Sequence, residues 1–150
     1  MFTISLPLSV PVTKKSKFSL NLNQYRNAHY YTLNTAKTKF QDIAKEAIIS
    51  LPKMDKISLV YTLFPPTKRD LDVANICSIV DKFFSDAMVA NGKLEDDNYH
   101  FLPEVSYRFG NIDKLNPRVE VQIRSLEPTY SLDGVPHANH PEPGRDSGSP

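Results

Sequence analysis

Hydrophobic and polar residues alternate along four segments of the chain, and this alternation predicts four β-strands. The segments are residues 2–9, 55–64, 101–109 and 119–123. A period of two gives each strand one apolar face that can be buried. Pro7 favours an edge position for the first strand, because proline has no N–H to donate to a central ladder. The last two strands, joined by residues 110–117, are predicted to form an antiparallel hairpin.

Two further segments have apolar residues at the three-and-four spacing of an amphipathic helix. The first is predicted to begin at a cap on Asn34 or Thr35 and to continue to Leu51. The second covers residues 73–91 and stops at Gly92. The element order β-α-β-α-β-β therefore predicts an α+β domain, in which a mixed sheet packs against two helices.

Composition divides the chain into one domain and a tail. With 150 residues, of which 40% are hydrophobic, the chain suits one small domain with a modest core, placed here at residues 1–127. Residues 128–150 contain five prolines, three glycines and two histidines. We expect this segment to be disordered, either as a natural terminus or as an appended segment.

Cysteine content and hydropathy indicate the cellular setting. Cys77 is the only cysteine, so the chain has no internal disulfide and no Cys-based metal site. A reducing cytoplasm suits this composition. No positive charge precedes the apolar residues of the N-terminus, and no apolar run approaches the ~20 residues that span a bilayer. We expect a cytoplasmic protein that is neither exported nor inserted in a membrane.

The net charge of +1 hides an uneven distribution of charge. Residues 1–69 contain eleven Lys and Arg but three acidic residues, whereas residues 70–104 contain eight acidic residues but two lysines. A basic surface beside an acidic metal site suits an enzyme that acts on a polyphosphate backbone. Mutual neutralisation of the two halves is the alternative, and composition does not decide between them.

Residues 13–33 have no clear period and are predicted to form a long loop or extended arm rich in basic and aromatic residues. Such residues suit phosphate contact and base stacking. The candidates for nucleic-acid binding are Lys14, Lys15, Lys17, Tyr25 and Arg26. A solvated loop whose tyrosines pack on the core explains the same composition.

Carboxylates gather at both ends of the predicted second helix. Asp70 and Asp72 precede it, and an acidic cluster follows it: Glu95, Asp96 and Asp97. Grouped carboxylates repel one another and therefore suggest a bound hard cation such as Mg²⁺ or Mn²⁺. Asp72 is also suited to be the N-cap of the helix, but capping does not explain Asp70.

The helix itself has a well-sorted polar face. At about 100° per residue, the side opposite the apolar stripe holds Asp72, Asn75, Lys82 and Asp86, interrupted by Ile79. This face suits a metal site with a neighbouring cation. A solvated surface, with Lys82 and Asp86 as an ordinary i,i+4 ion pair, accounts for it equally well.

The order of these residues is similar to that of a known nuclease family. The run RDLD is followed by Lys82 and Asp86 four residues apart, and then by Gly92 and an acidic pair that ends at Asp97. In this order the chain resembles the RusA family of Holliday junction resolvases. The likeness covers roughly residues 1–126, and its specific part is this central stretch. The family commonly reads RDLDN followed closely by a lysine, whereas about six further residues precede Lys82 here.

The resemblance implies a homodimeric endonuclease that uses Mg²⁺, or Mn²⁺ in its place, to resolve four-way DNA junctions in recombination and repair. It implies that Asp70, Asp72 and Asp97 are the catalytic and metal-binding carboxylates and that Lys82 is the essential lysine. We expect a bacterial or phage-encoded protein.

The resemblance also implies supporting residues around these groups. Asp86 would position Lys82, Asp96 would stand behind the metal ligands, and Asn75 would replace the asparagine of the family pattern. The basic pair Lys68 and Arg69, directly before Asp70, joins the candidates for DNA binding.

The predicted length of the second helix favours sites shared between two chains. A helix over residues 73–91 is ~27 Å long at 1.5 Å per residue. The five residues from Gly92 to Asp97 reach about 17 Å, so Asp97 does not easily return to Asp70 of its own chain. Two antiparallel helices about a two-fold axis would bring them together. A helix that begins nearer Ile79 would instead let one chain fold back on itself.

A different class of function stays open. The altered spacing before Lys82 also suits a non-catalytic DNA-binding or interaction module that keeps the fold but has lost turnover.

Overall fold

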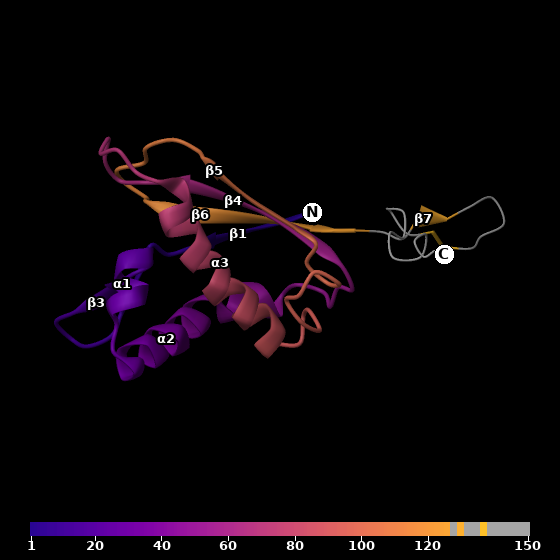
Figure 1. The fold of residues 1–150 in the computed structure, drawn as a ribbon, viewed down its shortest axis with the longest axis horizontal. Coiled ribbons are helices and arrows are strands. Elements are labelled where there is room, and N and C mark those ends of the chain that lie inside the picture. Colours follow the sequence, from indigo (N-terminus) through magenta and orange to yellow (C-terminus); the bar gives the residue numbers. More distant parts are fainter. Residues whose placement is uncertain (127–128, 131–135, 138–150) are drawn as a thin grey trace, which may run out of the picture.

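A four-stranded sheet in the order β1-β6-β4-β5 forms the centre of the molecule. The computed structural model describes residues 1–126, 129–130 and 136–137 (Figure 1). The strands of the sheet are β1 (Phe2–Leu6), β4 (Ile57–Phe64), β5 (Glu104–Phe109) and β6 (Arg118–Ser125). β1 lies at an edge, which confirms the position that Pro7 predicted.

The sheet is mixed, which confirms the predicted α+β class. β6 runs antiparallel to both β1 and β4, whereas β5 runs parallel to β4. The predicted hairpin of the last two strands is therefore wrong, because β4 lies between them. A parallel pair requires a long crossover, and α3 (Val73–Ala90) provides it by returning the chain to the start of β4.

The connection from β5 to β6 passes over the end of β4. Gly110 donates its N–H to the Leu63 carbonyl at 2.8 Å, and Asp113 donates to the Pro65 carbonyl at 2.8 Å. A Cβ atom at Gly110 would lie 2.6 Å from a ring carbon of Phe64, so this crossing needs glycine. The loop thus carries the chain across β4 instead of turning directly back beside β5.

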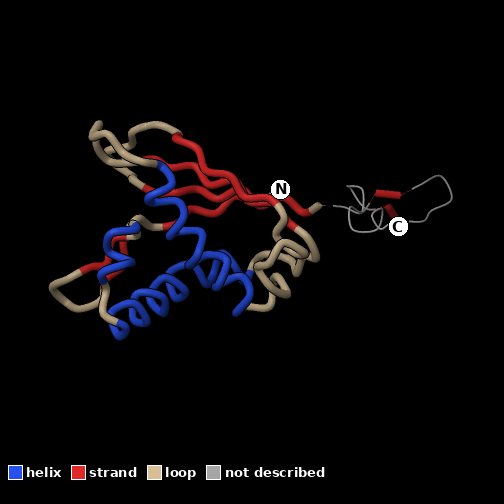
Figure 2. Tube along the Cα trace, viewed as in Figure 1, coloured by secondary structure: helices blue, strands red, loops and turns tan. Residues whose placement is uncertain are grey.

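The described residues form three helices, one more than predicted, and all lie on the same side of the sheet, with α3 packed against β4 and β5 (Figure 2). They are α1 (Leu22–Asn27), α2 (Tyr30–Ile49) and α3. None of the helices in the described part of the chain is long and apolar enough to cross a membrane.

The long loop predicted for residues 13–33 is wrong, because this segment contains regular structure. β3 (Lys17–Ser19) pairs with β2 (Ser9–Pro11) as an antiparallel hairpin, and α1 follows. The side chain of Asn21 caps α1 by accepting from the Gln24 N–H at 2.8 Å. Elements of three and six residues are too short to produce a detectable hydrophobic period, so the sequence pattern missed them.

The first long helix begins earlier than predicted. His29, and not Asn34 or Thr35, caps α2, and its Nδ1 accepts from the Tyr31 N–H at 3.3 Å. The first turn has exposed aromatic residues and no apolar stripe, so its sequence did not indicate a helix.

The prediction for the second helix agrees closely with the structure. It places the start of α3 at Val73, and α3 ends at Ala90. Gly92, with φ of +71°, stops it. Ile79 is the exception on the predicted polar face, because it is fully buried.

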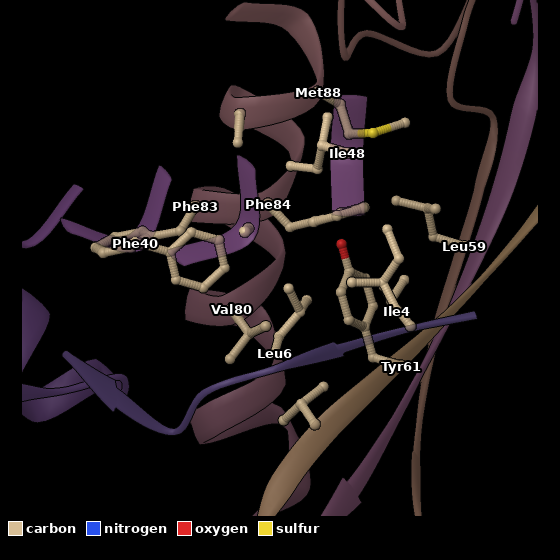
Figure 3. Close-up of a cluster of buried hydrophobic side chains, with 14 of the residues drawn as sticks. Ile4, Leu6, Phe40, Ile48, Leu59, Tyr61, Val80, Phe83, Phe84 and Met88 are labelled. Atoms are coloured by element: carbon tan, nitrogen blue, oxygen red, sulfur yellow. The ribbon is translucent and has the colours of Figure 1, made fainter. Parts of the chain in front are cut away.

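The core lies between the sheet and the helices (Figure 3). Alternate side chains of the strands, such as Leu6 and Tyr61, meet Phe40 of α2 and Phe83 and Phe84 of α3. Phe40 and Phe83 pack edge to face with ring centroids 5.6 Å apart. Burial of each such side chain contributes about 1.5–3 kcal/mol, and this holds α3 in a fixed position on the sheet.

The predicted disorder of residues 128–150 lies largely outside the described residues. Within that segment the structure describes β7 (Thr129–Tyr130) and β8 (Pro136–His137), which pair antiparallel.

Candidate functional site

The first predicted carboxylates lie at the amino-terminal end of α3. Asp72 is the N-cap of the helix, and its side chain accepts from the Ala74 N–H at 3.2 Å. Asp70 is exposed, two residues earlier, in the loop that follows β4. A carboxylate is favourable at a helix N-terminus because the helix dipole is positive there. The interpretation of Asp72 as the N-cap is therefore confirmed. Asp70 does not cap the helix.

The second set of carboxylates lies beyond the other end of α3. After Gly92 the chain forms an exposed acidic loop, in which Asp96 accepts from the Asp97 N–H at 2.8 Å and from the Asn98 amide at 2.9 Å. Each carboxylate oxygen of Asp96 thus accepts a hydrogen bond from within the loop, and these two bonds fix the shape of the loop. Asp97 follows it with its carboxylate exposed.

Asp97 is electrostatically coupled to the end of α3. Partial burial, together with the negative charges of Asp86 and Asp96, raises the pKa of the Asp97 carboxyl above its ordinary value. This contribution of Asp86 means that the last turns of α3 face the acidic loop. The negative charges of Asp86 and Asp96 beside Asp97 form a region of negative potential, which is favourable for a cation.

The polar face of α3 makes different contacts from those predicted. Asp86 has an ion-pair partner on α2, the Nζ of Lys37 at 4.0 Å. Lys82 lies over the ring of Tyr25, with its Nζ 5.8 Å from the ring centroid. The i,i+4 spacing suggested a Lys82–Asp86 ion pair; it gave no sign of Lys37, because the approach of α2 to α3 depends on tertiary packing.

Asn75 connects α3 to α1. Its side-chain oxygen accepts from the N–H of Leu22, the first residue of α1, at 2.9 Å. This bond holds α1 against α3 and so places Tyr25 below Lys82. Asn75 thus supports the site by orienting α1.

The three predicted metal ligands do not meet within one chain. Asp72 and Asp97 lie beyond opposite ends of an 18-residue helix, which is about 27 Å long. Within the residues that the structure describes, no three His, Cys, Asp or Glu side chains are grouped so that they could hold a metal ion. Carboxylates have the right chemistry for Mg²⁺, but a single chain supplies them as two separate sets.

The predicted basic residues lie on exposed surfaces at two places. Lys14, Lys15 and Lys17 belong to the β2–β3 hairpin, and Arg26 belongs to α1. Lys68 and Arg69 are exposed in the loop before Asp70. Tyr25 is half-buried, with its ring centroid 6.4 Å from that of Phe83. Its ring therefore serves the packing of α1 and the placement of Lys82.

One acidic residue of α3, Asp81, has a role that the sequence pattern did not predict. Asp81 accepts hydrogen bonds from Tyr61 at 2.7 Å, from Ser85 at 2.9 Å and from Tyr107 at 3.3 Å. Burial and the Asp81 charge raise the pKa of Tyr61 well above its ordinary value and that of Tyr107 to about 12. The sequence held one sign of this role: Asp81 lies between Val80 and Phe83, beside the apolar stripe of the helix.

Taken together, α3 presents two sets of carboxylates at its ends and a lysine on the polar face between them. The chain matches no family model and no curated protein. The geometry of these residues and the sequence motif are therefore the two features that bear on function.

Proposed function

We propose that the chain is a Mg²⁺-dependent endonuclease of the RusA type that cuts four-way DNA junctions in recombination and repair, and that it acts as a homodimer. The observation that carries this proposal is the placement of two sets of carboxylates beyond opposite ends of one rigid helix. Each set is half of a metal site. A bacterial or phage-encoded enzyme of the cytoplasm fits this activity.

A two-fold axis would complete the sites. If two copies of α3 lie antiparallel, the Asp70 and Asp72 end of one helix meets the Asp97 end of the other. Each dimer then has two equivalent sites, which suits paired cuts in a symmetric junction.

The residues at such a shared site fit a hard divalent cation. Asp70 and Asp72 of one chain and Asp97 of the other would hold it through carboxylate oxygens, and Mn²⁺ has the same ligand preference. Bound Mg²⁺ supplies activation of a water and stabilisation of charge on the scissile phosphate. Asp86 and Asp96 increase the negative potential that favours the cation.

Lys82 is the proposed catalytic cation of the chain. It is exposed on the polar face of α3, and Tyr25 keeps its ammonium group near the α1 side of that face. An ammonium group there would hold a phosphate oxygen and stabilise the charge that develops during bond cleavage. The exposed basic residues of the hairpin and of the Lys68–Arg69 loop would bind the flanking DNA backbone.

The first prediction tests the carboxylates. Asp70→Asn and Asp97→Asn should each abolish Mg²⁺-dependent cleavage of a synthetic four-way junction, because each variant removes a metal ligand. Binding of the junction in EDTA should be unchanged or stronger, since a negative charge facing phosphate is lost. Gel electrophoresis measures both.

Asp42→Asn is the matched control, because Asp42 is an exposed carboxylate of α2 outside the proposed site. It should cut like the wild type. Near wild-type cutting by Asp70→Asn or by Asp97→Asn would remove that residue from the metal site.

A non-catalytic DNA-binding module is the second candidate function. Two observations favour it: Asp72 already caps α3, and Asn75 already bonds to α1, so both have structural roles. This candidate predicts binding of the junction in EDTA but no cleavage when Mg²⁺ is added. The same assay therefore separates the two candidates.

A further inference from the structure

An open hollow with a mixed polar and apolar lining lies between the β2–β3 hairpin, α1 and the first turns of α2. Its volume is about 560 Å³, within the range of small-molecule sites. We call it the hairpin pocket; its lining includes Lys17, Asn23, Asn27, His29 and Tyr31. Figure 1 shows these elements together at one end of the molecule.

The charge around the hairpin pocket favours an anion. Residues 1–41 contain six Lys and Arg and no acidic residue. Lys17 lines the cavity, and the turn beside it carries Lys14 and Lys15. Hydrogen bonds from the Ser16 N–H to Thr13 Oγ1 at 3.0 Å and from Val12 to Ser16 at 3.1 Å keep this turn tight. The lysines are therefore presented from an ordered hairpin.

The wall formed by α2 favours a planar ring. His29 and Tyr31 both line the cavity, and their rings stack with centroids 5.3 Å apart at an interplanar angle of 17°. The ring of Tyr30 also packs edge-on against the ring of Tyr31, with their centroids 5.6 Å apart. Tyr31 is nevertheless 72% exposed. An exposed aromatic surface held in place by its neighbours is a platform on which a base can stack.

The wall formed by α1 favours polar recognition. Asn23 and Asn27 line the cavity one helical turn apart, and the Asn27 amide donates to Asn23 at 3.0 Å. Amide side chains of this kind bond to the edges of bases. On its other side α1 carries Tyr25, over which Lys82 lies. The hairpin pocket and Lys82 therefore flank the same short helix.

We propose that the hairpin pocket binds one unpaired nucleotide of a DNA strand, with the base stacked on Tyr31 and the phosphate on Lys17. The choice of DNA as the ligand rests on the proposed function. The pocket would hold an unstacked nucleotide on the side of α1 opposite Lys82, and so would give the chain a higher affinity for DNA with unpaired nucleotides than for a continuous duplex.

The experiment uses the full chain in EDTA and a short single-stranded oligonucleotide with one central 2-aminopurine. The chain has no tryptophan, so the fluorescence of the base analogue is measured without interference. Binding should quench this fluorescence through stacking. Tyr31→Ala should weaken binding about 5- to 150-fold and remove the quenching, which is the range for loss of one base–aromatic stack. Tyr31→Phe should keep both.

Tyr99→Ala is the matched control, because Tyr99 is 74% exposed and also lies beside a histidine, His100, at 4.3 Å. It should bind and quench like the wild type. Equal behaviour of Tyr31→Ala and the wild type, or an equal loss in Tyr99→Ala, would overturn the assignment. Competition by deoxyadenosine monophosphate as strong as by the oligonucleotide would also overturn it and would indicate a free-nucleotide site.

The outcomes separate this inference from the proposed function. Quenching that depends on Tyr31 in a protein that cuts no junction would support the hairpin pocket and reject the nuclease. Junction cutting by a protein whose quenching does not depend on Tyr31 would support the nuclease and reject the pocket.

Discussion

Asp97 is a carboxylate whose ionisation the fold opposes. Burial and the charges of Asp86 and Asp96 raise its pKa. A raised pKa means that the folded chain binds this proton more tightly than the unfolded chain does. Ionised Asp97 therefore destabilises the fold at neutral pH. Below the ordinary aspartate pKa of 3.8, Asp97 is protonated in both the folded and the unfolded chain, and the effect disappears.

We predict that Asp97→Asn raises the melting temperature at pH 7 and low ionic strength. The gain in free energy of unfolding should be small, within about 0.5 kcal/mol, because solvent screens this exposed group. It should shrink as the pH falls through the raised pKa and vanish below the ordinary one. Thermal denaturation followed by circular dichroism measures both effects.

Asp42→Asn controls for the loss of an exposed carboxylate elsewhere on the chain. A melting temperature of Asp97→Asn equal to or below that of the wild type at pH 7 would contradict the repulsion between Asp97 and its neighbours.

At the scale of elements, Asp81 ties α3 to the sheet. It joins the helix to Tyr61 of β4 and Tyr107 of β5 through hydrogen bonds at 2.7 and 3.3 Å. The Tyr61 hydroxyl is fully buried, so it depends on this acceptor. These hydrogen bonds orient the polar face of α3 relative to β4. The loop that follows β4 contains Asp70.

We predict that Tyr61→Phe lowers the free energy of unfolding by about 1.5–3 kcal/mol, the range for a hydrogen bond to a charged group. Asp81→Ala should lower it by about 1–3 kcal/mol more, because it leaves a buried hydroxyl without its acceptor. Urea denaturation gives the values.

The control for this pair is Tyr99→Phe, which removes the hydroxyl of an exposed tyrosine and should leave stability unchanged. If Tyr61→Phe is as stable as the wild type, the bond to Asp81 does not hold α3 on the sheet.

At the scale of the whole molecule, the length of α3 decides what one chain can do. Because the helix runs unbroken for 18 residues, Asp72 and Asp97 lie at opposite ends of the chain's central element. The possibility of a later start near Ile79, which would let the chain fold back, is contradicted by the observed start at Val73. Under the proposed function, a second copy of the chain supplies the other set of carboxylates.

We predict that mixing inactive Asp70→Asn with inactive Asp97→Asn restores nicking of a four-way junction. In a mixed dimer with shared sites, one site loses both carboxylates and the other is intact. Sites built within single chains leave both sites of the mixed dimer defective. Nicking after subunit exchange is measured on a labelled junction.

The control is each variant incubated alone under the same exchange conditions. Once light scattering and a tag-based pull-down have verified mixed dimers, the absence of recovered nicking would contradict the proposal that the sites are shared between two chains.

Much of the fold could be predicted from the sequence, because its signals are local. The alternation Ile57, Leu59, Tyr61, Leu63 identified β4, since a strand needs only one apolar face. The stripe ending at Met88, the cap at Asp72 and the stop at Gly92 identified α3 to within one residue at each end. The exposed positions of the candidate carboxylates and lysines followed from the same patterns.

Tertiary structure alone decided which elements and side chains are neighbours. The alternation of β5 is the same whether its neighbour is β4 or β6, so the crossover through α3 decided the pairing. The hairpin and α1 were too short to show a hydrophobic period, although Phe18 of the hairpin and Leu20 just before α1 are buried in the core. The pairing of Asp86 with Lys37, and the separation of Asp70 from Asp97, depend on the path of the chain, because distance in space is not determined by distance in sequence.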